Sequence, residues 1–281
     1  MSLSLRIVAT IALSTTVAVP ATAQTRGVFL GELTWPEAER RLRDAPMVIL
    51  PFGAGAKEHG PHLPLASDQI VMEYLAKIAV DSLPVVVAPP ILHGWFPAFA
   101  EFPGLTIGDP DVFWHYMLEA GRSLVRHGAR RVVFLNTGVT RSTGIPITLA
   151  ARTLYAQERV PTLVISWDDL ETAAMKALTT QRAGTHADDL ETSVILALRP
   201  ELVHMDRAVR DYRGDTVAAY PGYRPTDFSR RAGDPDFSTS GVFGDPTLAT
   251  AEKGRRVLGI MTQQWMKALR GFASSPLASG R

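Results

Sequence analysis

The chain of 281 residues contains no cysteine, so no disulfide can form and its stability must come from its core. An excess of charge is also missing. The chain has 29 basic and 28 acidic residues, a net charge of +1, and no basic patch stands out. Nucleic acid is therefore not an expected partner. Internal repeats and low-complexity runs are absent too, and the length suits a single domain.

The first 23 residues have the pattern of a secretory signal peptide. Arg6 precedes the apolar run Ile7–Leu13, and Ala21-Thr22-Ala23 is a small-x-small cleavage signal. The apolar run is too short for a membrane-spanning helix, which needs about 20 residues. We expect a mature domain at 24–281 that is periplasmic or secreted and has no membrane contact after cleavage. The alternative is a retained membrane anchor.

Beyond this leader, helical and strand-like segments alternate. Apolar residues at helical spacing predict helices at 34–44, 67–82, 109–127, 143–158, 188–198 and 250–269. Short, nearly continuous apolar runs predict strands at 47–52, 84–89, 131–135 and 161–166. This alternation indicates an α/β protein, a three-layer α/β/α sandwich with a mostly parallel central sheet. The segment 212–245, rich in Gly, Pro, Asp and Arg, is expected to be a long loop.

The most informative stretch follows the first predicted strand. It contains His59, His62 and Asp68 within ten residues, interrupted by Gly and Pro. A loop of this kind at a strand end can hold nitrogen and oxygen ligands for Zn²⁺, Mn²⁺ or Fe²⁺. The alternative is a surface loop in which His62 has no special role and Asp68 caps the following helix.

Other polar residues follow neighbouring strands or open a helix. Asn136 and Trp167 each come directly after a predicted strand, and ligands of parallel sheets bind beyond those ends. His186 and Glu191 surround the start of a predicted helix, where both can approach one site. The alternatives are a loop histidine and a first-turn acid favoured by the helix dipole.

Four motifs, in this order, resemble the creatininase family of metal-dependent amidohydrolases. They are His59-Gly60-Pro61-His62-Leu63-Pro64-Leu65 with Asp68, Phe102-Pro103-Gly104, His186 with Glu191-Thr192-Ser193, and Gly241–Pro246 with Glu252-Lys253-Gly254. The resemblance implies the same α/β/α sandwich and often a hexamer. It also implies hydrolysis of cyclic or linear amide bonds of a small molecule at a metal centre.

Two departures from the family pattern fall on metal ligands. The family has Glu-x-His where this chain has Lys57, Glu58 and His59, and it has a histidine where this chain has Gly138. In the family the two lost ligands serve the same metal, so one of two metal sites is expected to be dismantled here. Side chains alternate along an extended segment, so Lys57 should share the side of His59 and pair with Asp68. Glu58 would be a ligand only if the preceding loop bulges.

The resemblance, taken together with these residues, implies a hydrolase of C–N bonds. His59, Asp68 and Glu191 are expected to bind one Zn or Mn ion, with two ions or none as alternatives. His186 would relay a proton or stabilise an oxyanion, and Lys57 would stabilise negative charge. The residues expected to line the substrate site are His62, His93, Trp95, Trp167 and Asn136.

Several alternatives stay open. Aromatic side chains at loop bases are as often ordinary packing, and that role suits Phe96 and Phe99 better than substrate binding. A lactone or ester hydrolase could use the same attack by water. A metal-free binding protein that inherited the fold is the third possibility, supported by the loss of two ligands.

Overall fold

The computed structural model of the chain describes residues 26–138, 142–212, 232–233 and 237–277. The predicted signal peptide lies outside these residues, as does most of the predicted loop 212–245. Within the described part, no helix is long and apolar enough to cross a bilayer.

A five-stranded sheet forms the centre of the molecule. The order across the sheet is β1 (Val28–Phe29), β3 (Val86–Val87), β2 (Val48–Phe52), β4 (Val132–Asn136) and β5 (Thr162–Ser166). All four pairings are parallel. Every residue of β2 and β4 is buried, as expected for parallel strands that are covered on both faces. The structure thus confirms the predicted α/β class and parallel sheet.

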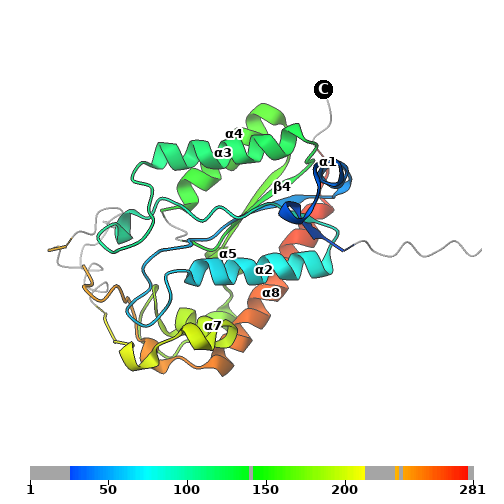
Figure 1. Cartoon of the computed structure of the whole chain (residues 1–281). Coiled ribbons are helices and arrows are strands. Elements are labelled where there is room, and N and C mark those ends of the chain that lie inside the picture. Colours follow the sequence, from blue (N-terminus) through cyan, green and yellow to red (C-terminus); the bar gives the residue numbers. More distant parts are fainter. Residues whose placement is uncertain (1–25, 139–141, 213–231, 234–236, 278–281) are drawn as a thin grey trace, which may run out of the picture.

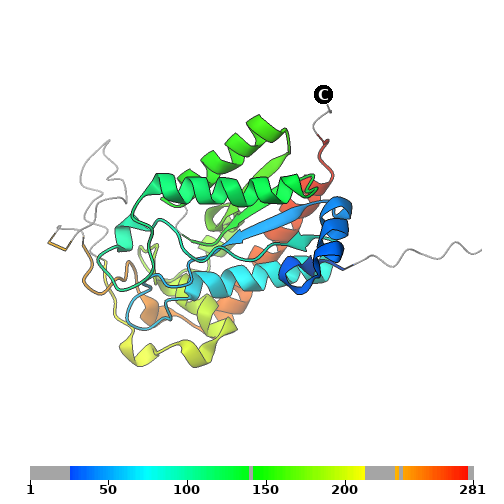
Figure 2. The ribbon, with the colours of Figure 1, turned by 45° about the horizontal axis from the view of Figure 1, so that its top comes forward.

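Helices cover both faces of the sheet, giving three layers (Figures 1 and 2). One face carries α1 (Trp35–Asp44), α3 (Pro110–Arg126) and α4 (Gly144–Glu158), and the other carries α2 (Ser67–Ser82), α7 (Asp189–Leu198) and α8 (Ala251–Ala273). Alternation along β2 builds both cores. Val48, Leu50 and Phe52 pack in the α1–α3–α4 layer, while Ile49 packs in the α2–α7–α8 layer. Shorter helices complete the chain at Leu30–Glu32, Pro97–Phe99, Trp167–Leu170 (α5), Ala173–Lys176 (α6), Pro200–Leu202, Met205–Arg207 and Pro246–Leu248.

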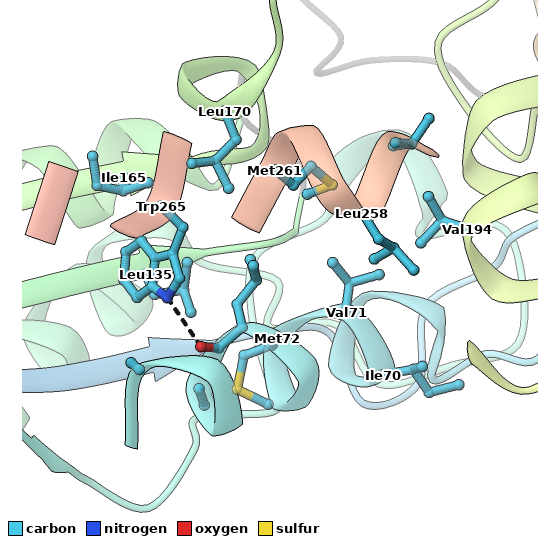
Figure 3. Close-up of a cluster of buried hydrophobic side chains, with 14 of the residues drawn as sticks. Ile70, Val71, Met72, Leu135, Ile165, Leu170, Val194, Leu258, Met261 and Trp265 are labelled. Carbon is cyan, nitrogen blue, oxygen red and sulfur yellow. Dashed lines mark hydrogen bonds between the residues drawn. The ribbon is translucent and has the colours of Figure 1, made fainter. Parts of the chain in front are cut away.

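The core below the sheet is centred on Trp265 of α8 (Figure 3). Its indole is fully buried, and its Nε1–H donates to the Leu75 carbonyl oxygen of α2 at 2.9 Å. A buried indole needs such a partner. Met261 and Leu258 on α8 pack in the same cluster as Val71 on α2. This packing fixes α2, which carries Asp68, against the rest of the molecule.

The predicted helices are found at nearly their predicted positions, and α1 has the capping box of Thr34 and Glu37 that the sequence indicates. The predicted strand 84–89 is shorter than expected. Only Val86–Val87 form β3, because Pro89 and Pro90 have no N–H to donate to the ladder. Strand β1 has no counterpart among the predicted strands, since two residues carry no periodic pattern.

Candidate active site

The candidate site lies beyond the carboxyl ends of the strands, on the segment that follows β2. This segment is held in place by backbone hydrogen bonds: Gly55 N–H donates to the Leu92 carbonyl oxygen at 3.0 Å, and Lys57 N–H to that of Leu65 at 3.0 Å. Asp68 is brought to it by the first turn of α2. Backbone that is fixed in this way gives its side chains defined directions.

Lys57 and His59 converge on the buried carboxylate of Asp68. The Lys57 Nζ lies 2.8 Å from Asp68 Oδ2, and His59 Nε2 lies 3.0 Å from Asp68 Oδ1. Burial opposes ionisation of Asp68, but the Lys57 ammonium and His59 outweigh it and hold the pKa of Asp68 well below its usual value. This geometry confirms that Lys57 points toward Asp68, as side-chain alternation predicts.

Glu58 points elsewhere. Its Oε2 lies 3.2 Å from His186 Nε2, and its Oε1 accepts from the Gly60 N–H. Burial opposes its ionisation, but His186 and the Gly60 N–H hold the pKa of Glu58 below its usual value. Gly241, at φ +73°, lies against this carboxylate so closely that a Cβ would collide with it. Glu58 therefore acts on the orientation of His186.

Two backbone carbonyls fix the tautomers of the two histidines. His59 Nδ1 lies 2.9 Å from the Lys57 carbonyl oxygen, and His186 Nε2 lies 2.9 Å from that of Glu58. Because a carbonyl only accepts, each of these nitrogens carries a proton. The other ring nitrogens, His59 Nε2 and His186 Nδ1, face the carboxylates of Asp68 and Glu191; they donate to these carboxylates when protonated and offer a lone pair to a cation when neutral. Histidine metal ligands are typically oriented in the same way, by a hydrogen bond from the other ring nitrogen.

The geometry of the donors also suits a metal. His59, His186 and Glu191 each offer a ligand atom, and these three atoms lie within 4.8 Å of one another. Two imidazoles and one carboxylate form a familiar catalytic zinc set that leaves a position open. The predicted ligands His59 and Glu191 lie in this group, and His186 joins them. Asp68 and Glu58 stand beside the group as partners of its two histidines; their ligand roles stay predictions.

The start of α7 positions Glu191. The carboxylate of Asp188 caps the helix by accepting from the N–H groups of Leu190 and Glu191, and Ala187 before it is left-handed at φ +49°. Glu191 Oε2 in turn accepts from the Ala187 N–H at 2.6 Å and lies 3.6 Å from His186 Nδ1. Burial raises the pKa of Glu191 to about 7, against the opposing effects of His186 and Lys57. The carboxyl group is thus poised to change protonation near neutral pH.

His62 has a different position from the three donors. It is fully buried, and its Nε2 lies 2.8 Å from Thr192 Oγ1 on α7. Burial and the nearby His59 lower the pKa of His62 to about 4, so the ring is neutral at physiological pH. His62 thus joins the loop after β2 to the helix that carries Glu191; its predicted substrate contact stays a prediction.

The other residues predicted to line the substrate site differ in burial and in their contacts. Asn136 is buried, its Nδ2 donates to Ser166 Oγ at 3.2 Å, and its Oδ1 accepts from the Gly138 N–H at 3.0 Å, so both ends of its amide are engaged within the protein. Trp95 and Trp167 are half-buried against the two cores, as ordinary packing would have them, and His93 is exposed. Substrate contact by these four side chains stays a prediction.

Phe96 and Phe99, for which the sequence favours a packing role, lie beside the centre. The Phe99 ring centroid lies 4.4 Å from that of His186, and the Lys57 Nζ lies 5.1 Å from the Phe99 ring and 6.0 Å from the Phe96 ring. Phe96 is fully buried, which agrees with the packing role expected for it. Phe99 packs against the same core but also covers His186. The only available signal was its closeness in sequence to the Phe102-Pro103-Gly104 motif.

Comparison with known proteins yields a consistent set of relatives. A family model described as "Creatininase: Creatinine amidohydrolase" matches residues 31–269. The "Creatinine amidohydrolase" of Pseudomonas putida is 30% identical over an alignment of 261 positions, which covers 87% of this chain and 97% of that protein. A "Mycofactocin precursor peptide peptidase" of Mycobacterium tuberculosis (strain CDC 1551 / Oshkosh) is 29% identical, covering 88% of this chain and 94% of that protein.

Solved structures agree with the sequences. A structure titled "Creatininase Mn" superposes with a TM-score of 0.73 at 28% identity, covering 89% of this chain and all of that one. A mutant creatininase of the "Zn-Zn type" gives a TM-score of 0.74 at 27% identity with the same coverage. The family match at 31–269 thus includes every strand of the sheet except β1, and all the elements that carry the candidate site.

Proposed function

Because the chain belongs to the creatininase family, whose relatives named above are hydrolases, we propose that it hydrolyses an amide C–N bond of a small molecule at a single divalent metal centre. The observation that carries this proposal is the group formed by His59, His186 and Glu191, with both histidine tautomers set by backbone carbonyls. Zn and Mn are the ions of choice, since both suit these ligands and related structures carry them.

His59 Nε2, His186 Nδ1 and a Glu191 oxygen would hold the ion. Bound there, the metal would supply a Lewis acid that polarises a carbonyl group and lowers the pKa of water. The chain contributes the orientation of the ligands through the carbonyl oxygens of Lys57 and Glu58, and through the Glu58 carboxylate on His186. Such supporting contacts commonly decide metal affinity.

Lys57 would take the place of a second cation. Its ammonium keeps the neighbouring Asp68 ionised at 2.8 Å, and its side chain borders a cleft beside the metal group. A fixed positive charge there would stabilise the negative charge that develops on the substrate carbonyl oxygen during attack. The family pattern loses two ligands of one metal site at Lys57 and Gly138. We propose that the charge of the Lys57 ammonium replaces the charge of that metal.

The N-terminal pattern supports export. We propose that Met1–Ala23 is removed and that the enzyme works in the periplasm or outside the cell as a homo-oligomer. N-terminal sequencing of the protein expressed with its leader should find a start near Gln24. An intact Met1 on cytoplasmic protein would contradict export, and light scattering of the mature protein would give the oligomeric state.

One observation favours a second candidate, a metal-free binding protein. Lys57 already supplies Asp68 with a cation, so this half of the site is electrostatically satisfied without metal. Against it stands the group of His59, His186 and Glu191, a set of polar side chains that is costly to bury without a use.

A substrate panel tests the proposal. The purified chain, loaded with Zn²⁺ or Mn²⁺, should hydrolyse at least one member of a panel of creatinine, small linear amides and short peptides. Turnover should vanish in His59→Ala and Glu191→Ala. Hydrolysis of lactones or esters but no amide would support the ester-hydrolase alternative. No turnover of any compound, with unchanged ligand binding in both variants, would support a binding protein.

A further inference from the structure

Gln181 ties together three segments that meet beside the candidate centre. Its Nε2–H donates to Asp188 Oδ2 at 2.6 Å. Its Oε1 accepts from the Asp245 N–H at 2.8 Å and from the Asp189 N–H at 3.3 Å. A carboxylate only accepts and a backbone N–H only donates, so these partners require a donor and an acceptor at the end of one side chain. A glutamine amide meets that requirement, whereas an ionised glutamate or a methionine of similar length does not.

The backbone around the Gln181 amide leaves room for it. Gly184 and Gly244 lie against this side chain, and a Cβ at either position would collide with the amide group. Both glycines have a positive φ, +153° and +148°, which a residue with a side chain rarely adopts. Gly244 belongs to the Gly241–Pro246 motif. The structure therefore gives this glycine of the motif a role, which is to admit the Gln181 amide.

On one side, the amide holds the carboxylate that caps α7. Asp188 Oδ1 accepts from the N–H groups of Leu190 and Glu191 at 2.9 and 3.0 Å, while Gln181 holds Oδ2. The Glu191 carboxylate itself accepts from the Ala187 N–H, directly before the cap. The direction of the Glu191 side chain therefore depends on the position of Asp188.

On the other side, the amide holds the segment that pairs with the backbone of His186. The Phe243 N–H donates to the His186 carbonyl oxygen at 2.9 Å. Asp245, two residues after Phe243, is fixed by the hydrogen bond from its N–H to Gln181. One side chain thus supports the backbone next to two of the three proposed metal ligands, His186 and Glu191.

We infer that Gln181 is a positioning residue that fixes His186 and Glu191 relative to each other. The inference rests on the proposed function, in which these two residues are metal ligands. Gln181 acts on them through Asp188 and Asp245. Without its amide, the cap of α7 and the segment at Asp245 would lose their common partner, and the two ligands would no longer be held at a defined distance.

Gln181→Met tests the inference, because it keeps the length of the side chain and removes its hydrogen bonds. In the metal-free protein, the ¹⁵N resonance of His186 Nδ1, which lies 3.6 Å from Glu191 Oε2, should shift. The resonance is assigned by its absence in His186→Ala. The Kd for Zn²⁺, measured by calorimetry, should rise at least tenfold. Gln181→Glu should have the same two effects, because its carboxylate would repel Asp188.

Val194→Ala is the matched control for a loss of stability alone. Val194 lies on α7 and is fully buried in the core cluster shared with α2 and α8. Its truncation should lower the free energy of unfolding. The His186 resonance and the Kd for Zn²⁺ should nevertheless stay close to their wild-type values, because the hydrogen bonds of Gln181 remain.

If Gln181→Met leaves the His186 resonance or the Kd for Zn²⁺ unchanged, the inference is overturned. The same holds if Val194→Ala weakens Zn²⁺ binding as much as Gln181→Met, because the effect would then be one of stability. Should Gln181→Met fail to fold, Gln181→Glu decides, since it keeps the acceptor for the Asp245 N–H. A wild type that binds no Zn²⁺ would refute the proposed metal centre, while the His186 resonance of the metal-free variants would still test the role of Gln181.

Discussion

At the scale of single residues, the most unusual feature is a lysine buried with its counter-ion. Lys57 and Asp68 expose only 3% and 7% of their side chains, so each depends on the other for its charge. Removing one partner of a buried pair leaves the other charge uncompensated, which typically costs about 3–5 kcal/mol. The sequence predicted the pairing itself, because Lys57 and His59 are two residues apart on an extended segment.

Lys57→Met tests that dependence. We expect it to lower the free energy of unfolding by about 3 kcal/mol, measured by urea denaturation at pH 7. Lys77→Met is the control, because Lys77 pairs with Asp81 at the same 2.8 Å but in solvent, where the loss should stay below about 1 kcal/mol. Equal losses of unfolding free energy in the two variants would show that the buried pair contributes no more to stability than the exposed pair. The double variant Lys57→Met/Asp68→Asn should recover much of the stability.

The raised pKa of Glu191 predicts that metal binding depends on pH. Burial raises the pKa of Glu191 to about 7 in the metal-free protein, so below that pH the carboxyl is protonated and a metal must displace the proton. Apparent affinity for Zn²⁺ should therefore rise as pH increases from 5.5 to 7, and this contribution should level off above 7. Glu191→Gln should bind more weakly and show a flatter profile in calorimetric titrations. A wild-type profile no steeper than that of Glu191→Gln would refute this role.

At the scale of elements, helices were predicted more accurately than strands. The Thr34–Glu37 capping box and the span of α2 follow from local signals, whereas β1 and β3 are two residues long and exist only because β2 provides partners. The left-handed turn at Ala187, which aims Glu191 at His186, gives no sequence signal either, since alanine is not a residue typical of that conformation. Such details depend on tertiary contacts.

The segment around Gly241 is an element that acts on the site. Gly241→Ala should displace the Glu58 carboxylate from His186 and lower metal affinity and activity at least tenfold. Gly233→Ala is the matched control. Gly233 has a similarly positive φ of +103°, but a Cβ added there would meet no atom of the described residues within 4 Å, so among these residues the variant bears the backbone strain alone. Comparable metal affinities in the two variants would contradict the orienting role of Glu58.

At the scale of the whole molecule, the alternation of helices and strands was enough to predict a parallel sheet between two helical layers. The resemblance to the creatininase family, rather than this alternation, grouped His59, Asp68, His186 and Glu191 in one site. It could not divide these residues into ligands and partners, because that division depends on which carbonyl each histidine contacts. Nor could it show that Gly138 packs against Phe52, where a Cβ would lie 2.9 Å from the ring.

The contact between Gly138 and Phe52 bears on the number of metals. A histidine at position 138 would require the ring of Phe52, a core residue, to shift, so a second metal site there would disturb the packing of the core. Since Lys57 occupies the other lost position, we expect the chain to bind one metal ion in a centre of two histidines and one carboxylate.

Elemental analysis of the mature protein, purified without chelator and reloaded with Zn²⁺ or Mn²⁺, tests this stoichiometry most directly. We expect about one ion per chain, reduced to a small fraction in His59→Ala and in Glu191→Ala, with both variants keeping the wild-type circular dichroism spectrum. Two ions per chain, or none after reloading, would contradict a single-metal centre.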